Sequence, residues 1–310
     1  MNVYAMRYRQ QRGVALLVVL WACTLLAILL GGYATASRLE ATQVRYQLAQ
    51  TQVRYLAEAG VMRAIYESAQ NVGALGKPAT GPFWIADGRL YTLRIDDTDI
   101  QIRVSDETGK VDLNTATPDV LQGLFQAAGV DAGSAAALVA NLVESRDAQR
   151  LNNQTYGNQR YKQAGLNHGP RYAEFASLED LQAVLGMTPA IYQKVEPAIT
   201  LWSRRPQPTP LLAPALALSA LPGMDMNKAQ RFIAVREATQ PPAPPPVLPN
   251  GMPAGNWRGG NVKTIYATAS TADGMRSALQ VTVRFDALRP GQKKVGTPYT
   301  ILRWQDDVGR

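Results

Sequence analysis

Hydrophobic residues dominate one stretch near the N-terminus, directly after a basic segment. The stretch VALLVVLWACTLLAILL, Val14 to Leu30, carries no charge, and GGYA extends it to about 20 residues. A helix of that length spans the roughly 30 Å hydrocarbon core of a bilayer. Three arginines precede the stretch and only Arg38 closely follows it, so the charge bias predicts a cytoplasmic N-terminus. The pattern therefore predicts a membrane-spanning segment over residues 14–34.

The main alternative for this stretch is a cleaved export signal. Such a signal has a shorter apolar region of about 7 to 15 residues and a small-residue cleavage site beyond it, which Ala34-Thr35-Ala36 could supply. The following residues, up to Ser68, contain no proline and only one glycine, Gly60, so the helix is expected to continue. Apolar residues recur there at spacings of three, four and seven, and predict an amphipathic continuation over residues 35–70: Val44, Leu48, Tyr55, Ala59, Met62 and Tyr66. Cleavage after Ala36 would remove the anchor from this helix.

Alternating apolar and polar residues predict strands on both sides of a helical region. Residues 83–105 contain Leu90 to Ile95 and Ile100 to Val104, separated by the polar turn Asp96-Asp97-Thr98-Asp99. That turn lacks the glycine and the distal bidentate carboxylate of an EF-hand, so a simple hairpin is favoured. Residues 263–310 contain three further segments of this kind, Ile265 to Ala269, Leu279 to Phe285 and Tyr299 to Trp304. We expect all of these strands to form one antiparallel sheet that lies on the long helix.

Helical periodicity fills residues 106–237. Three units each join a leucine-rich helix to a second helix through a glycine turn, at Gly129, Gly186 and Gly223. The first unit has a clear start, since Thr117 precedes a proline at the first helical position. The proline-rich segments Pro206 to Pro214 and 238–262 are expected to be extended connectors. The middle of the chain therefore reads as an all-α domain inserted into the sheet.

The glycine turns resemble helix-hairpin-helix elements, which present backbone N–H groups to a nucleic-acid phosphate. Two of the turns carry an aspartate, Asp131 or Asp225, where a phosphate would approach, and no consistent lysine or arginine follows them. Structural packing is therefore favoured over DNA binding. A membrane-anchored DNA receptor is kept as the alternative function.

Charge and chemistry give little support to catalysis. The net charge of +8 falls to +5 without the arginines that precede Gly13, and the remaining basic residues are dispersed. The single histidine, His168, lies in a polar loop, and the single cysteine, Cys23, lies in the apolar stretch. A catalytic Cys-His pair or a histidine metal cluster in the exported region is thereby excluded. We expect a protein that is not an enzyme.

The N-terminus resembles a type IV pilin or pseudopilin precursor, with a basic leader ending in glycine before a retained apolar helix. The resemblance implies that the prepilin peptidase removes leader 1–13 between Gly13 and Val14 and methylates the new N-terminus. Most pilins have a glutamate at the fifth mature position, where this chain has Val18. That carboxylate would neutralise the N-terminus of a neighbouring subunit inside the bilayer. A subunit without it suits the end of a filament.

Three further motifs, in this order, resemble the K-class minor pseudopilins of type II secretion: DETGKVDLNTA (106–116), FASLEDLQAVLGMTPAIYQKVEPAITLWS (175–203) and LSALPGMD (218–225). The expected fold is α+β, a type IV pilin-like long N-terminal helix packed on an antiparallel sheet with a large inserted all-α domain. The resemblance implies a minor pseudopilin at the pseudopilus tip that primes assembly with I-class and J-class subunits and assists export of folded exoproteins. Other implied partners are the major pseudopilin, the prepilin peptidase and the inner-membrane machinery. Its implied place is the bacterial inner membrane, single-pass, with a periplasmic domain; a type IV pilus minor pilin is a further alternative.

The resemblance also implies calcium, held by an acidic loop of the helical domain. The corresponding segment, residues 145–172, has Asp147 as its only carboxylate, although Asn152, Asn153 and Asn158 could contribute oxygens. Tight calcium binding needs several negatively charged ligands. Asp147 is therefore a candidate metal ligand in a segment that lacks most of the required charge, and no cofactor is assigned.

Overall fold

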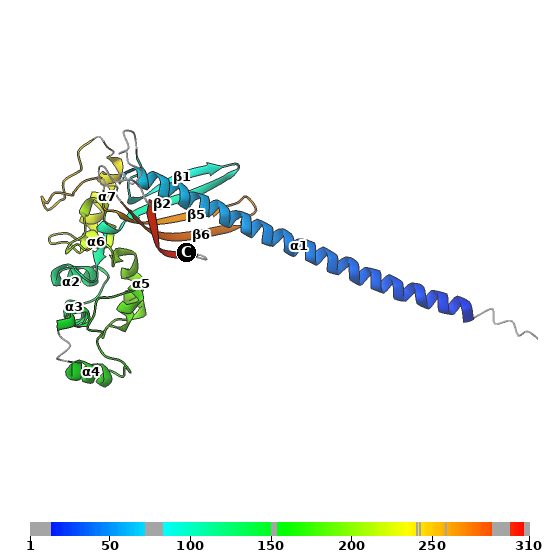
Figure 1. Ribbon diagram of the computed structural model, residues 1–310, viewed down its shortest axis with the longest axis horizontal. Coiled ribbons are helices and arrows are strands. Elements are labelled where there is room, and N and C mark those ends of the chain that lie inside the picture. The colour runs from blue at the N-terminus through cyan, green and yellow to red at the C-terminus, as the bar shows by residue number, and fades with distance from the viewer. Residues whose placement is uncertain are drawn as a thin grey trace, which may run out of the picture. The chain divides into compact units, whose positions relative to one another are not determined.

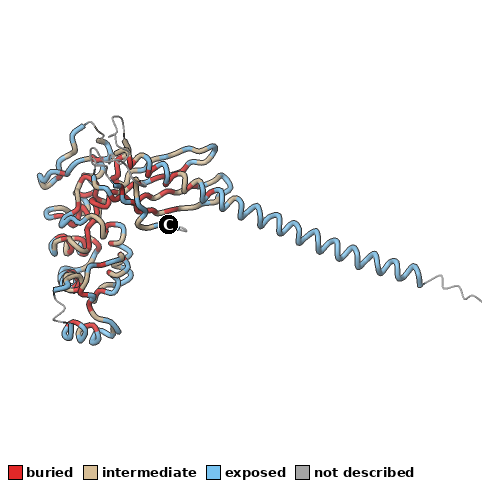
Figure 2. Tube along the Cα trace, viewed as in Figure 1, coloured by how far each residue is buried: buried red, intermediate tan, exposed pale blue. Residues whose placement is uncertain are grey.

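The computed structural model describes residues 14–71, 83–149, 154–239, 241, 243–257, 259–286 and 298–306. The leader and Gly13 lie outside these residues. The chain divides into two compact units, one ending at Val53 and one beginning at Arg54. Helix α1, Val14–Asn71, runs through the boundary. Its residues from Val14 to Val44 are all exposed, whereas buried residues concentrate in the second unit (Figure 2).

The second unit contains a five-stranded antiparallel sheet in the order β1-β2-β5-β6-β7 (Figure 1). Its strands are β1 Asp87–Ile95, β2 Thr98–Asp106, β5 Val262–Ser270, β6 Arg276–Phe285 and β7 Tyr299–Asp306. The central pairing joins β2 to β5 across the whole helical region, with Ile102 opposite Ala267. The prediction that strands before and after the helical region share one sheet is confirmed.

The C-terminal part of α1 packs on one face of this sheet. Small residues face the strands, and Gly60 lies so close that an added Cβ would be 2.8 Å from Cγ2 of Ile100. Ala57, Val61 and Ala64 on the same side of the helix are fully buried. Because none of these side chains is large, the helix axis can approach the sheet closely. The pilin-like arrangement of a long helix on an antiparallel sheet is thus present.

The helical region occupies the chain between β2 and β5. Its regular elements are α2 Pro118–Ala127, α3 Ala132–Arg146, α4 Gln154–Gln163, α5 Pro189–Val195, α6 Ala215–Ser219 and α7 Met226–Ala238. Short 3₁₀ turns lie among them: η1 Glu107–Gly109, η3 Leu178–Ala183, η4 Glu196–Ala198 and η5 Pro210–Leu212. A small parallel pair joins β3 Val111–Asp112 to β4 Ile199–Thr200. The core of the helical region is mainly aliphatic and includes the fully buried Leu121, Leu124, Phe125, Leu142, Leu181 and Leu218.

One local expectation for this region was wrong. The first helix expected in the segment 175–203 is the six-residue 3₁₀ helix η3, because the chain turns again at Gly186 after too few residues for a full α-helix. In the segment after α7, which was expected to be an extended connector, Leu248 and Ala254 are each only 3% exposed. The N–H of Leu211 donates to the Ala254 carbonyl. This segment therefore packs against the helical region.

Candidate functional site

The N-terminal half of α1 has the properties of a membrane anchor. It holds an 18-residue window of mean hydropathy 2.8, and none of that window is buried within the protein. Val14 is the first helical residue, and Val18 is 58% exposed on the same helix. Cys23 is also exposed there. These features fit a single-pass anchor, while the cleavage at Gly13 and the role of Val18 stay predictions.

Helix α1 carries a second apolar face, and it is not the one that contacts the sheet. The apolar stripe expected from the sequence includes Tyr55, Met62 and Tyr66, which are 64%, 44% and 53% exposed. At about 100° per residue, these positions lie on the side of the helix opposite Ala57 and Ala64. The expectation of a single apolar stripe was wrong, because the small residues that contact the sheet had been overlooked. The soluble part of α1 is thus apolar on two opposite faces.

The exposed stripe extends beyond the second unit along the same helix. Leu48 and Val44 are 67% and 61% exposed and continue the spacing of three, four and seven residues. Such spacing is typical of a helix that packs against another helix. The guanidinium of Arg63 lies 5.9 Å from the ring centre of Tyr66, at one border of the stripe. We define the exposed stripe as Val44, Leu48, Tyr55, Met62 and Tyr66.

The segment proposed for calcium is largely helical. Helix α4 occupies Gln154–Gln163 and includes Asn158, whereas Asn152 and Asn153 lie outside the described residues. Asp147 follows α3 as its C-cap, and its carboxylate accepts a hydrogen bond from the N–H of Gln149 at 3.0 Å. Among the described residues, no group of three or more acidic, histidine or cysteine side chains could hold a metal ion. A role of Asp147 in calcium binding therefore stays a prediction.

The glycine turns do form helix-turn-helix corners, but two of their anion-binding positions are occupied. Asp131 caps α3 by accepting from the N–H of Ser134 at 3.0 Å, and Asp225 caps α7 by accepting from the N–H of Lys228 at 2.8 Å. These backbone hydrogen bonds lower the pKa of both aspartates. Both caps therefore stay ionised at neutral pH and repel a phosphate, which argues against the DNA-receptor alternative.

The remaining turn, after η3, is capped differently. Thr188 accepts a hydrogen bond from the N–H of Ile191 at the start of α5. Upstream, Ser177 and Asp180 form a capping box at the start of η3. Burial acts to raise the pKa of Asp180, but backbone hydrogen bonds from Ser177 and Ala176 outweigh it and lower that pKa. The acidic pair is thus explained by helix capping.

The motif DETGKVDLNTA joins the sheet to the helical region. Asp106, at the end of β2, is fully buried. Its Oδ2 lies 2.7 Å from Nζ of Lys263 in β5 and accepts from the N–H of Gly260 at 2.9 Å. Its Oδ1 accepts from the N–H and hydroxyl of Thr108. One carboxylate therefore connects the point where the chain leaves the sheet with the point where it returns.

Glu107 forms a second buried pair beside it. Its Oε1 lies 2.6 Å from Nζ of Lys110, and the hydroxyl of Thr264 donates to the same oxygen at 2.6 Å. Burial acts to lower the pKa of Lys110, but the neighbouring Glu107 outweighs it and the pKa is raised. The raised pKa keeps the Lys110 ammonium charged inside the protein.

Asp112 and Asn114 connect the motif to the following sequence block. Oδ2 of Asp112 accepts from the hydroxyl of Ser203 at 3.2 Å and from the N–H of Arg204 at 2.8 Å. The amide of Asn114 donates to the carbonyl of Phe175 and accepts from its N–H. Asp112 and Asn114 therefore tie the motif to residues 175 and 203–204, far along the chain.

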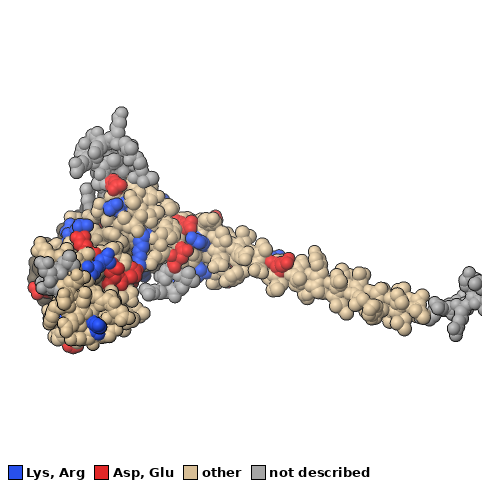
Figure 3. Space-filling model, turned by 60° about the horizontal axis from the view of Figure 1, so that its bottom comes forward, with Lys and Arg blue, Asp and Glu red and all other residues tan. Residues whose placement is uncertain are grey.

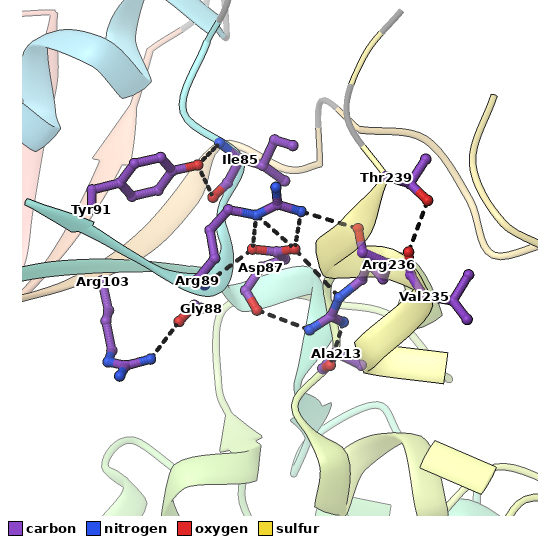
Figure 4. Close-up of polar contacts among 10 residues, drawn as sticks. All are labelled: Ile85, Asp87, Gly88, Arg89, Tyr91, Arg103, Ala213, Val235, Arg236 and Thr239. Carbon is purple, nitrogen blue, oxygen red and sulfur yellow. Dashed lines mark hydrogen bonds and ion pairs between the residues drawn. The ribbon is translucent and has the colours of Figure 1, made fainter. Parts of the chain in front are cut away.

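A third buried pair joins α7 to β1 (Figure 4). Arg236 is 2% exposed, and its Nε lies 3.3 Å from Oδ2 of Asp87. Its other nitrogens donate to the carbonyls of Ala213 and Asp87 at 2.8 and 3.1 Å. Arg89 approaches the same carboxylate from the other side, at 2.8 to 3.2 Å. Burial lowers the pKa of Arg236, opposed by the charge of Asp87.

These pairs were missed in the sequence because their signals are weak there. Asp106, Glu107 and Lys110 lie within a turn-like pattern that usually marks the surface. Arg236 is one basic residue at the end of a helix, where a base is favoured by the dipole alone. Only the return of the chain to β5 brings Lys263 to Asp106.

Comparison with known proteins identifies the region that carries the motif. Residues 100–204 match the family described as type II secretion system (T2SS), protein K. This match covers about a third of the chain and shows what that region is similar to. The K-class resemblance of the sequence is thereby confirmed, and the protein K family is a structural component of secretion rather than a catalytic one.

A solved structure supports the fold. The chain resembles one in "The Crystal Structure of the GspK-GspI-GspJ complex from enterotoxigenic Escherichia coli Type 2 Secretion System", with a TM-score of 0.51 and 16% identity. The match covers 86% of this chain and 100% of the other. No curated protein matches the sequence significantly. At this identity the likeness is one of fold, and it confirms the expected pilin-like α+β architecture.

Proposed function

We propose that this protein is the minor pseudopilin at the tip of a type II secretion pseudopilus, where it primes assembly with I-class and J-class subunits and assists export of folded proteins. The observation that carries the proposal is the exposed stripe of α1. A helix apolar on two opposite faces is stable in water only if both faces are covered. Its own sheet covers one face, and helices of neighbouring subunits would cover the other.

The family match and the anchor support the same proposal. A protein K region on a membrane anchor suits a subunit that is held in the inner membrane before assembly, with its folded unit in the periplasm. Val18 supports the tip position, since a subunit without a carboxylate there offers no charge partner to the next N-terminus in the bilayer. The GspK, GspI and GspJ proteins crystallised as one complex, and we infer equivalent partners here.

Processing is tested by N-terminal sequencing of the membrane-bound protein from cells with and without a prepilin peptidase. We expect a mature chain that begins with methylated Val14 only when the peptidase is present. A chain that begins at Ser37, or that retains Met1 in both strains, would overturn the proposal.

The helix interface is tested by placing one negative charge on or beside the exposed stripe. Leu48→Glu and Met62→Glu put a carboxylate on the stripe, and Gln47→Glu puts the same charge on an adjacent exposed position of the same helix. We expect the two stripe variants to lose co-purification with I-class and J-class subunits while keeping their thermal unfolding temperature. Equal loss with Gln47→Glu would show that the stripe is not the interface.

A further inference from the structure

A groove runs between α2 and the turn that joins α6 to α7, away from the stripe and the buried pairs. It has a volume of about 580 Å³, within the range of ligand-binding clefts. Its base is fixed where α2 meets the backbone of α6: a Cβ added at Gly123 would lie 2.5 Å from the carbonyl oxygen of Ala220. Because no side chain separates the two elements there, the groove is preformed.

Polar groups without partners line one wall of the groove. Asp119, Gln122 and Gln126 follow one another along α2, with the two glutamines one turn apart. Among the described residues, none of the three side chains forms a hydrogen bond or an ion pair. A glutamine amide can both donate and accept. Two such amides, one turn apart, therefore match the alternating N–H and C=O groups of an extended polypeptide.

The opposite wall is adaptable and apolar, with one further negative charge. Met224 and Met226 are half-buried there, and Asp225 lies between them. Flexible methionine side chains suit surfaces that accept several different partners. Asp225 is ionised at neutral pH, since backbone hydrogen bonding lowers its pKa. Lys228 lies 3.6 Å from it, but the Lys228 ammonium also donates to the carbonyl of Gly223.

We infer that this groove binds an extended, basic segment of an exported protein, one that carries lysine or arginine beside apolar residues. The lining contains two carboxylates and no base. Asp225 pairs with Lys228 outside the lining, whereas Asp119 forms no ion pair among the described residues, so the lining favours a cationic segment and disfavours nucleic acid. The unpartnered amides would hold its backbone, and the methionines would contact its apolar side chains. The inference rests on the proposed role in export and names the chemistry of the cargo.

The test uses the full chain in zwitterionic nanodiscs and a fluorescein-labelled probe, Gly-Lys-Met-Lys-Pro-Lys-Gly, with a counterpart that has glutamate in place of lysine. We expect the basic probe alone to bind, and binding to weaken with added salt. Asp119→Asn and Asp225→Asn should each weaken binding about two- to fivefold, as expected for one exposed charge. Asparagine keeps the helix cap at residue 225.

Asp131→Asn is the matched control, because Asp131 is an equivalent helix cap outside the groove. Equal weakening by Asp131→Asn, equal binding of the glutamate probe, or binding of a duplex oligonucleotide instead would overturn the inference. Cells that carry the Asp119→Asn/Asp225→Asn double variant should release less exported protein into the medium. The variant itself should still co-purify normally with its partner subunits. Normal secretion with normal co-purification would overturn the groove's role in export and leave the proposed tip function standing.

Discussion

Oδ2 of Asp87, at the start of β1, lies 3.3 Å from Nε of Arg236, at the end of α7, and both side chains are almost completely buried. The two residues are separated by the whole helical region in sequence. A buried ion pair that replaces apolar packing adds little net stability, but removal of one partner leaves an uncompensated charge. The pair therefore fixes where the end of the helical region sits on the sheet.

Asp87→Ala is expected to lower the free energy of unfolding by about 3–5 kcal/mol, because it leaves the buried Arg236 without its carboxylate. Urea unfolding of the full chain in detergent micelles, followed by tryptophan fluorescence, measures the change. Arg204→Ala is the control, since its pair with Glu174 is 75% and 63% exposed and should contribute less than about 1 kcal/mol. A loss for Asp87→Ala no larger than for the control would contradict the role assigned to the pair.

Gly60→Ala is expected to destabilise the second unit by about 1–3 kcal/mol. The new Cβ would lie 2.8 Å from Cγ2 of Ile100 and overpack the contact between α1 and the sheet. Helix propensity acts the other way by about 1 kcal/mol, so a net loss identifies the steric effect. Thermal unfolding of the full chain provides the measurement. Gly32→Ala adds the same methyl group where nothing lies within 4 Å; if both variants gained stability alike, the close approach would be refuted.

The sequence predicted the sheet and most of the helices because their patterns are local. Alternation along Ile100 to Val104 and the Thr117-Pro118 helix start each depend on a few adjacent residues, and both elements are present. The anchor was equally clear, since its length and lack of charge need no tertiary contact to interpret.

The side of α1 that meets the sheet and the buried ion pairs could not be predicted, because they depend on contacts between distant segments. The exposed stripe of α1 has larger side chains than the face of the helix that meets the sheet, so hydrophobicity alone found the exposed stripe and missed the face that meets the sheet. Ala57 and Gly60 contact the sheet because they are small, and no scale of hydrophobicity emphasises them. Asp106 similarly looks like a surface aspartate until the chain returns after more than 150 residues with Lys263.

A double-mutant cycle should detect coupling between Asp106 and Lys263, whose side chains are 0% and 3% exposed. Asp106→Asn and Lys263→Met each leave one buried charge unpaired, so each is expected to lower the free energy of unfolding by several kcal/mol. Because the double variant removes both charges, its loss should be smaller than the sum by about 0.5–3 kcal/mol. Urea unfolding of the four proteins gives the coupling energy. Additive losses would show that the two residues act independently.

The capping aspartates Asp131 and Asp225 should make stability fall in acid. Their folded-state pKa values lie below the ordinary value of 3.8, so the ionised form stabilises the folded state. This contribution is fully present above the unfolded pKa and is lost as the pH falls through the lower folded pKa. The free energy of unfolding of the wild type should therefore decline below about pH 4, and ¹³C carboxyl titration should report both low pKa values directly.

The Asp131→Asn/Asp225→Asn double variant separates this charge effect from the hydrogen bond. Asparagine still accepts the capping hydrogen bond but has no proton to gain between pH 5 and pH 2. The variant should consequently show a shallower loss of stability with acid than the wild type, and the two curves should converge at the lowest pH. Parallel curves across this range would contradict the charge effect. They would mean that the two caps stabilise α3 and α7 through the capping hydrogen bond alone, without a contribution from their negative charge.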